Sequence, residues 1–426
     1  MSETFPHKTH VLDSGLRLVI LPMQGTKTAT AYVLVGTGFK YEIKDQAGIA
    51  HFLEHMMFKG TTRRPDKLAI ARELDGIGAE YNAFTSKEET GYFARASASK
   101  ADTIMDVVYD IFLNSLIRQE DVDIERGVIA EEINMYKDQP QQHIPYLFEE
   151  LLYGDQPAGW GLKAWQSALP HLQGDTLTRY FHTQYVAQNT IVAVAGAVDP
   201  DRVLQKTQEL FTNIRHDKPA TKLPIVENQT EPRALIFDKG TDQTHFYIGF
   251  RGYSMFDDKR YALALLGNIL GSGMSSRLWH EIREKRGLAY YVGAGTDTYT
   301  DHGLLAVNAG VNNSKATEAV KVILEELAKV KKDGVTEEEL QRAKDQVEGG
   351  MVLGLENSRR VAALGASGLL YYGRVLTPEE ELDKIKQVTL EDIKRVAQEV
   401  FRSERLNLAL IGPHKDEQPF TALLKI

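Results

Sequence analysis

The chain has 426 residues, 42% of them hydrophobic, which is enough apolar material for more than one core and for two to three domains. Its formal net charge of -9 at pH 7 argues against a protein that binds nucleic acid. The sequence contains no cysteine, so it excludes disulfides, thiolate metal ligands and a cysteine nucleophile, and any metal ion must be bound by histidine and carboxylate groups.

We expect no targeting signal in the N-terminal segment of this sequence. Residues 1–7 lack a basic stretch followed by an apolar core, and they lack the arginine-rich, acid-poor character of an organelle transit peptide. No window reaches 18 uninterrupted apolar residues, so we expect neither a membrane-spanning helix nor a membrane partner. We predict a soluble, cytoplasmic protein, unless a leader has been removed from the chain.

The first predicted elements lead to a helix with an unusual polar face. We expect strands at residues 16–23 and 28–38, followed by a helix that carries His51, Glu54 and His55. At about 100° per residue, these three side chains share one narrow face, and the apolar residues of the segment take the opposite arc. The segment therefore places two imidazoles and a carboxylate on an otherwise buried helix.

The spacing of these side chains suits a zinc site. His51 and His55 are one helical turn apart, which is close enough for both rings to bind one Zn²⁺ at about 2.0–2.1 Å. Glu54 faces the same side and can take a proton from the attacking water. The order His-x-x-Glu-His is the inverted form of the zinc peptidase motif His-Glu-x-x-His. The alternative is a pair of core histidines beside an ordinary helical glutamate, so a third ligand is required.

The next elements predict a sheet edge. Residues 65–76 have the pattern of an amphipathic helix, and residues 79–96 have that of a strand pair. The first strand of the pair contains Asn82, Ala83 and Phe84 in a polar, loosely patterned sequence that is typical of an edge. An exposed edge can accept an extended peptide as an additional strand.

The remainder of the chain divides into two halves. Further helices are expected at residues 101–116, 119–137, 146–153, 176–185 and 200–214, with a strand at 190–196. The polar, proline-bearing segment 215–232 is interpreted as a linker between a metal-bearing half, 1–214, and a second half, 233–426.

The second half repeats the first in outline. A strand at 243–252 leads into a helix at 259–270, and Gly412 lies 216 residues after Gly196 at the end of a similar helix and strand. The second-half helix carries no metal ligand, so one half is predicted to bind the metal ion and the other to keep only the scaffold.

The third ligand is sought in the helix at 119–137. Glu132 lies two helical turns after Glu125 and about 20° from its face, whereas Glu131 lies about 120° away. Glu132 can therefore act as the ligand, while Glu125 orients a histidine through a hydrogen bond. For either glutamate alone, a solvated helix face is the ordinary interpretation.

These motifs together resemble the family of pitrilysin, insulysin and mitochondrial processing peptidase, which are inverted zinc endopeptidases. In this chain 76 residues separate His55 from Glu132. In that family a ligand glutamate follows the histidine motif after a similar number of residues, and it ends a Glu-Arg-x-x-x-x-x-Glu segment of a helix, as Glu132 does here after Glu125. The resemblance implies one Zn²⁺ per chain on His51, His55 and Glu132, with Glu54 as the base.

The resemblance extends to two substrate-binding segments. The edge strand predicted at 79–86 is similar to the strand that holds the substrate backbone in the family. Arg283 and Tyr290 resemble an arginine and tyrosine pair of the non-metal half, which contacts the substrate carbonyl and the developing oxyanion. Without the resemblance, Arg283 reads as part of a solvated charge cluster. Tyr291 alternates faces with Tyr290 on a strand, so only one of them can face the site.

The resemblance implies an α+β fold of two homologous half-chains, each a mixed β-sheet packed by helices. It implies an endopeptidase that cleaves peptides or unfolded polypeptide segments, bound in extended form inside a chamber. Because one chain carries both the metal motif and the Arg/Tyr pair, we expect a homodimer. Two alternatives stay open: a non-catalytic structural subunit, as in respiratory-complex core proteins, and a peptide-binding partner that needs a different second subunit.

Overall fold

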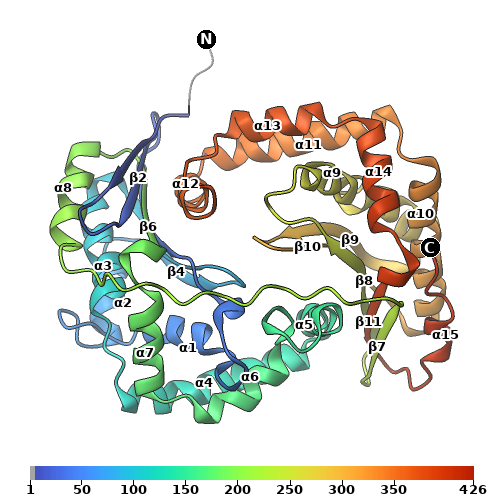
Figure 1. Cartoon of the computed structure of the whole chain (residues 1–426), viewed down its shortest axis with the longest axis horizontal. Coiled ribbons are helices and arrows are strands. Elements are labelled where there is room, and N and C mark those ends of the chain that lie inside the picture. The colour runs from blue at the N-terminus through green and yellow to red at the C-terminus, as the bar shows by residue number, and fades with distance from the viewer. Residues whose placement is uncertain (1–4) are drawn as a thin grey trace. The chain divides into compact units, whose positions relative to one another are not determined.

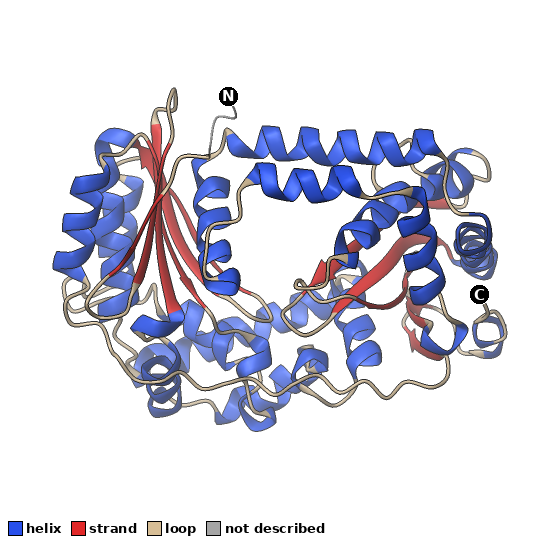
Figure 2. Cartoon of the chain, turned by 45° about the horizontal axis from the view of Figure 1, so that its top comes forward, coloured by secondary structure: helices blue, strands red, loops and turns tan. Residues whose placement is uncertain are grey.

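The computed structural model describes residues 5–426 (Figure 1). The chain forms two compact units, each with a mixed sheet and helices (Figure 2), which confirms the predicted α+β class. Neither unit is continuous in sequence. The first contains Met1–Glu132, Lys163–Leu223 and Gly350–Glu381, and the second contains Ile133–Leu162, Pro224–Gly349 and Leu382–Ile426.

The sheet of the first unit has six strands in the order β1-β2-β6-β3-β5-β4. Strands β2 and β6 are parallel and the other neighbours are antiparallel. The inner strands β3 and β6 are almost wholly buried, whereas β4 is a polar edge strand, as its sequence predicted. The strands are β1 Lys8–Val11, β2 Arg17–Pro22, β3 Thr28–Val35, β4 Glu80–Thr85, β5 Thr90–Ser97 and β6 Thr190–Gly196.

Helices lie on both faces of this first sheet (Figure 2). Helix α12 packs against β2, β3 and β6, and Gly365 allows the close approach, because a Cβ there would lie 2.8 Å from a methyl group of Leu21. Helix α3 packs against β3 and β5. The helices of this unit are α1 Ile49–Met56, α2 Lys67–Asp75, α3 Ala101–Asn114, α7 Gly174–Gln184, α8 Pro200–Leu210 and α12 Ser358–Tyr372, with α6 Leu162–Ala168 starting at its boundary.

The sheet of the second unit has five strands in the order β7-β11-β8-β10-β9. They are β7 Arg233–Asp238, β8 Gln243–Gly252, β9 Ala289–Thr298, β10 Gly303–Asn312 and β11 Asn407–Gly412. The helices are α5 Pro140–Tyr153, α9 Lys259–Gly271, α10 Ala316–Asp333, α14 Leu390–Val400 and α15 Gln418–Thr421. Three of the five unit boundaries fall within α4 Gln119–Asp138, α11 Glu337–Leu355 and α13 Pro378–Gln387.

The two sheets repeat one topology. When β1 is left out, the order β2-β6-β3-β5-β4 of the first sheet corresponds to the order β7-β11-β8-β10-β9 of the second. Each sheet has one parallel pair at the same place in this order, β2 with β6 and β7 with β11. That pair aligns Pro22 with Gly196 in the first sheet and Asp238 with Gly412 in the second, so each residue has its counterpart 216 positions later. The predicted internal repeat is therefore present in the register of the strands.

Each sheet is covered in part by a helix from the other half of the sequence. Helix α5, which precedes the second sheet in the chain, packs against β7, β8 and β11, whereas α12, which follows four strands of that sheet, packs in the first unit. The division into 1–214, a linker at 215–232 and 233–426 stays a prediction. Residues 214–230 form no helix or strand.

None of the helices in the described part of the chain is long and apolar enough to cross a bilayer.

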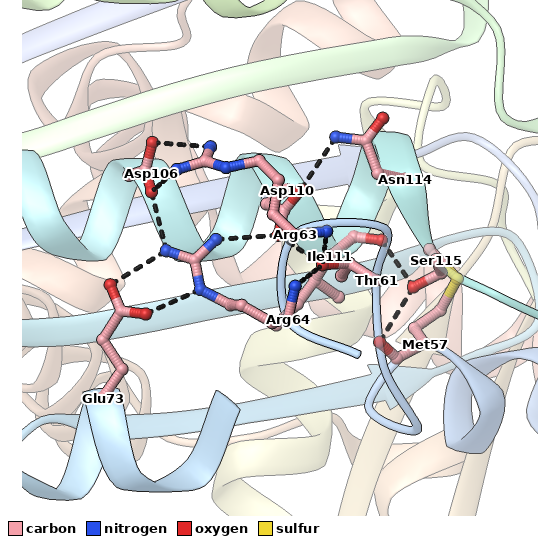
Figure 3. Close-up of polar contacts among 10 residues, drawn as sticks. All are labelled: Met57, Thr61, Arg63, Arg64, Glu73, Asp106, Asp110, Ile111, Asn114 and Ser115. Carbon is pink, nitrogen blue, oxygen red and sulfur yellow. Dashed lines mark hydrogen bonds and ion pairs between the residues drawn. The ribbon is translucent and has the colours of Figure 1, made fainter. Parts of the chain in front are cut away.

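A buried polar network joins the loop after α1 to α2 and α3 (Figure 3). Arg64 is 6% exposed, and its guanidinium donates to Glu73 at 2.7 and 2.8 Å, to Asp106 at 2.7 Å and to Asp110 at 2.7 Å. The Thr61 hydroxyl also donates to Asp110, at 2.6 Å. Burial alone would raise the pKa of Asp106, but hydrogen bonds from the two neighbouring arginines outweigh it and hold that pKa below its usual value. The network therefore holds α2 to α3.

The same network reaches the end of α1. The Ser115 hydroxyl, just after α3, lies 2.9 Å from the carbonyl of Met57 and 2.8 Å from that of Ile111 (Figure 3). The C-terminal end of α1 is thus tied to α3 by its backbone.

Replacing Arg64 by Met should lower the free energy of unfolding of the first unit by about 3–5 kcal/mol, because three carboxylates lose a buried partner. Denaturant titration measures this change. Arg63→Met is the matched control, since Arg63 pairs with Asp106 while its side chain is 50% exposed, and it should cost about 0–1 kcal/mol. Equal losses for the two variants would contradict the role assigned to Arg64.

Candidate metal centre

Helix α1 is held by its apolar face and by a carboxylate at its N-terminus. Phe52, Leu53 and Met56 are fully buried, each contributing roughly 1.5–3 kcal/mol, and this burial sets the rotation of the helix. The buried Glu42 carboxylate accepts hydrogen bonds from the amides of Gly48 at 2.7 Å and Ala50 at 3.0 Å. Burial raises the pKa of Glu42 to about 8, although the two amides act in the opposite direction.

The start of α1 also requires a glycine. Gly48 has φ of 87°, a left-handed conformation that favours glycine, and a Cβ on it would lie 3.2 Å from the Trp165 ring. The same ring stacks on His51, with centroids 5.8 Å apart and planes at 24°. Trp165 therefore fixes both the start of the helix and the orientation of one predicted ligand.

The structure brings the three predicted metal ligands together. The Nε2 atoms of His51 and His55 are 3.2 Å apart, and Oε2 of Glu132 lies 3.7 Å from the first and 3.4 Å from the second. One donor atom from each residue lies within 4.8 Å of the others. Glu131, the neighbour that the helical geometry disfavoured, is exposed. Two imidazole nitrogens and a carboxylate oxygen are the ligands of many catalytic zinc sites, so the donor set fits zinc.

Glu125 occupies the position predicted for an orienting group. Its Oε1 atom lies 2.8 Å from Nδ1 of His55, and its other oxygen pairs with Lys59. A proton on Nδ1 that points at Glu125 leaves Nε2 of His55 free to bind a metal ion. Burial alone would raise the pKa of Glu125, but His55 and Lys59 outweigh it and hold that pKa below its usual value.

The two histidines have opposite electrostatic environments. Burial, with His55 nearby, lowers the pKa of His51 to about 4. Burial also acts to lower the pKa of His55, but the hydrogen bonds that its ring donates to Glu125 and Glu132 outweigh burial and raise that pKa to about 9. The two carboxylates lie at opposite nitrogens of His55, and Glu132 places negative charge next to both Nε2 atoms, where a cation would be stabilised.

Glu54 stands beside the ligand cluster without belonging to it. Its Oε2 atom accepts a hydrogen bond from the Thr85 hydroxyl at 2.5 Å, and burial raises the pKa of Glu54. The carboxylate lines the same pocket as His55 and Glu125. Glu54 therefore lies in one pocket with a predicted metal ligand, His55, and with Glu125.

A pocket of about 270 Å³ extends from these residues to the edge strand β4. Tyr81, Asn82 and Ala83 line it from the strand, and Phe58 and Ile70 add apolar surface. The remaining lining residues are Glu54, His55, Lys59, Lys67, Ala71 and Glu125.

The three predicted substrate-strand residues differ in their environment. The amide of Ala83 donates to the Asn82 side chain at 2.9 Å. Phe84 packs on the hydrophobic core beneath α12 and covers Gly91, where a Cβ would lie 2.3 Å from its ring. The Phe84 side chain is therefore turned to the core and is not part of the pocket lining.

Arg283 and Tyr290 lie together in the second unit. Arg283 belongs to a π-helix, Trp279–Glu284, and its Nη1 atom donates to the carbonyl of Tyr290 at 2.6 Å. Its guanidinium lies 4.2 Å from the centre of the Trp279 ring. Both π-helical turns and arginine–aromatic stacking are frequent at functional sites.

A β-bulge separates Tyr290 from Tyr291. Strand β10 aligns Gly310 with Tyr291 and the next residue, Val311, with Ala289, so Tyr290 has no cross-strand partner in β10. Tyr290 is 71% exposed, whereas the Tyr291 hydroxyl lies 3.0 Å from Nδ1 of His245. Of the two tyrosines, Tyr290 is therefore the one available to a ligand.

Sequence reasoning did not identify several residues of this site. Lys59 follows His55 by four residues, a helical spacing that could have suggested a shared face. Thr85 was recognised only as part of the edge strand. Trp165 is far from the motif in sequence, and no local pattern indicated its contact with His51.

Comparison with known proteins identifies the family. Residues 18–163 match the family model described as insulinase, peptidase family M16, and residues 171–347 match the one described as peptidase M16 inactive domain. An uncharacterized zinc protease of Streptomyces coelicolor is 35% identical over 413 residues, which are 96% of this chain and 90% of that protein. An uncharacterized zinc protease of Bacillus subtilis is 33% identical over 406 residues, 95% and 98% of the two chains.

Solved structures show the same fold. The crystal structure of a protease from Helicobacter pylori matches with a TM-score of 0.90 at 24% identity and covers 96% of this chain and 99% of that one. The structure of a peptidase M16 inactive domain from Pseudomonas fluorescens has a TM-score of 0.86 at 18% identity and covers 96% and 98%. The chain belongs to the insulinase family of peptidases, peptidase family M16. The second family model is described as an inactive domain, and its match includes α9. This helix has no histidine, aspartate or glutamate, so it has none of the predicted metal ligands that α1 carries.

Glu125→Gln should weaken zinc binding by about 10–100-fold, because the carboxylate that orients His55 loses its charge. Zinc titration against a competing chelator measures the affinity. Glu131→Gln is the matched control, an exposed glutamate on the same helix, and it should bind zinc as the unmodified protein does. An unchanged affinity in Glu125→Gln would show that the hydrogen bond does not support the ligand.

Proposed function

We propose that this chain is a zinc-dependent endopeptidase, which hydrolyses peptides or unfolded polypeptide segments bound in extended form. The observation that carries the proposal is the convergence of His51, His55 and Glu132 within 4.8 Å, with the Glu54 carboxylate in the adjoining pocket. The zinc protease names of relatives that span nearly the whole chain support it.

His51, His55 and Glu132 hold the zinc ion, one per chain. When bound there, zinc supplies a Lewis acid that polarises the scissile carbonyl. Glu54 accepts the proton of the attacking water and then donates it to the leaving amine. Burial, which raises the pKa of Glu54, brings that carboxyl closer to the range in which it can both take and return a proton.

The substrate adds to the sheet as a further strand. Strand β4 is an edge strand, and Asn82 and Ala83 lie where it borders the pocket that contains Glu54. Main-chain hydrogen bonds to this edge align the peptide with little dependence on its sequence. Phe84 contributes through its backbone, because its side chain packs on the core.

Glu54→Gln should abolish peptide hydrolysis and leave zinc binding intact, because the amide cannot accept the proton of water and is not a ligand. Digestion of a peptide mixture, analysed by mass spectrometry with and without chelator, measures the activity, and metal analysis measures the zinc. Hydrolysis that persists in Glu54→Gln, or that survives chelation, would refute the assignment.

Two alternatives make different predictions in the same assay. A non-catalytic structural subunit has neither bound zinc nor hydrolysis. A peptide-binding partner of an unlike subunit is inactive alone and active after the second chain is added. The converging ligands argue against the first alternative, and the presence of Arg283 and Tyr290 in the same chain argues against the second.

Arg283 and Tyr290 bind the substrate carbonyl and stabilise the developing oxyanion. Tyr290→Phe should therefore reduce kcat by about 10²–10³-fold while zinc content is unchanged. Tyr291→Phe is the control, because the Tyr291 hydroxyl contacts His245 within the second unit. Equal rates for Tyr290→Phe and the unmodified protein would remove Tyr290 from the mechanism.

The proposed assembly is a cytoplasmic homodimer in which the half-chains enclose the substrate in a chamber. The basis is that one chain carries the metal-binding residues and the Arg283 and Tyr290 pair. Sedimentation analysis of the active preparation tests the dimer, and a monomer with full activity would contradict it.

A further inference from the structure

Thr85 is the last residue of the edge strand β4, and its hydroxyl donates to Oε2 of Glu54 at 2.5 Å. We infer that Thr85 is a positioning residue, which holds the carboxylate of Glu54 in its working orientation and couples it to the strand that aligns the substrate. The inference rests on the proposed function, because it takes Glu54 as the base.

The chemistry of a general base explains why such a contact matters. A glutamate carboxylate stands at the end of three rotatable bonds, and a hydrogen bond to one oxygen selects among its orientations. With Oε2 of Glu54 engaged by Thr85, the second oxygen is left to accept the proton of water. A base must lie within hydrogen-bond reach of that proton, and a misplacement of about 1 Å can cost about 10²-fold in rate.

The Thr85 hydroxyl is itself held by a rigid hairpin. Thr85 pairs with Thr90 across β4 and β5, and the amide of Ser86 donates to the carbonyl of Glu89 at 2.8 Å. The amide of Phe39 donates to the carbonyl of Ser86 at 3.0 Å, which ties the hairpin to a neighbouring loop. Because this backbone is fixed on both sides, Thr85 orients Glu54 rather than following it.

The strand connects this contact to the substrate. Asn82 and Ala83 precede Thr85 by three and two residues on the same strand. A peptide that pairs with the outer edge of β4 therefore binds to the same strand that orients the Glu54 carboxylate through Thr85. One strand then sets the register of the scissile bond and the direction of the carboxylate.

Thr90, in the same hairpin, is a threonine whose hydroxyl makes a backbone hydrogen bond. Its hydroxyl donates to the backbone carbonyl of Thr37 at 2.9 Å, and the residue is fully buried. The Thr85 hydroxyl donates to an ionisable side chain of the site. Thr90→Val is therefore a matched control, since it removes one threonine hydroxyl from the hairpin without touching Glu54.

The experiment compares Thr85→Val, Thr85→Ser and Thr90→Val with the unmodified protein and Glu54→Gln. We expect Thr85→Val to lower kcat by about 10–100-fold, with KM changed by less than about twofold. Zinc affinity and thermal stability should match those of Thr90→Val. Thr85→Ser, which keeps the hydroxyl, should recover most of the rate. A crystal structure of Thr85→Val should show the Glu54 carboxylate in more than one orientation.

The outcomes separate this inference from the proposed function. If the unmodified protein hydrolyses peptides and Glu54→Gln does not, the proposed function holds. A Thr85→Val protein with an unchanged rate, or with Glu54 still in one orientation, would then overturn the inference alone. A loss of rate shared with Thr90→Val, or one that Thr85→Ser does not recover, would also overturn it. Absence of hydrolysis by the unmodified, zinc-loaded protein would overturn both.

Discussion

The site depends on one constraint: α1 must bury its apolar face completely while its opposite face holds two imidazoles close to a carboxylate from another helix. Phe52, Leu53 and Met56 set the rotation of the helix, and Glu42 and Trp165 set its start. With the helix fixed in this way, the Nε2 atoms of the two histidines lie 3.2 Å apart. The apolar packing therefore supplies the preorganisation that a metal site needs, and the polar groups supply its chemistry.

A second layer of polar contacts surrounds the cluster of His51, His55 and Glu132. Glu125 and Lys59 form a charged pair behind His55, so the ring that both carboxylates approach is also the more basic one. Beyond it, the Arg64 network holds α2, which lines the pocket, against α3 (Figure 3). Each of these contacts acts on the position of a group nearer the site, and none of them depends on the presence of a substrate.

The two units show how one topology can serve two purposes. Their sheets share a strand order and a register, but α1 carries the histidine pair whereas α9 has no histidine, aspartate or glutamate. The second unit instead has the π-helix of Arg283 and the β-bulge at Tyr290, which place a half-buried arginine next to an exposed tyrosine. The scaffold is thus retained in both units, while the polar groups that it displays differ.

The sequence by itself determined the local features, because periodicity reports which face of an element is apolar. It identified α1 with its histidines, the polar edge strand β4, the repeat that ends at Gly196 and Gly412, and the helix face shared by Glu125 and Glu132. The resemblance that these motifs carry indicated the family, and the family implied the fold class.

Contacts between segments far apart in the chain were decided only by the tertiary structure. Trp165 against His51, Thr85 against Glu54, and the helices α5 and α12 on the sheets of opposite halves follow from how elements pack, which local pattern does not record. The choice of Tyr290 over Tyr291 is of the same kind. Alternation on a strand allows either tyrosine to face outward, and a bulge formed with β10 makes the selection.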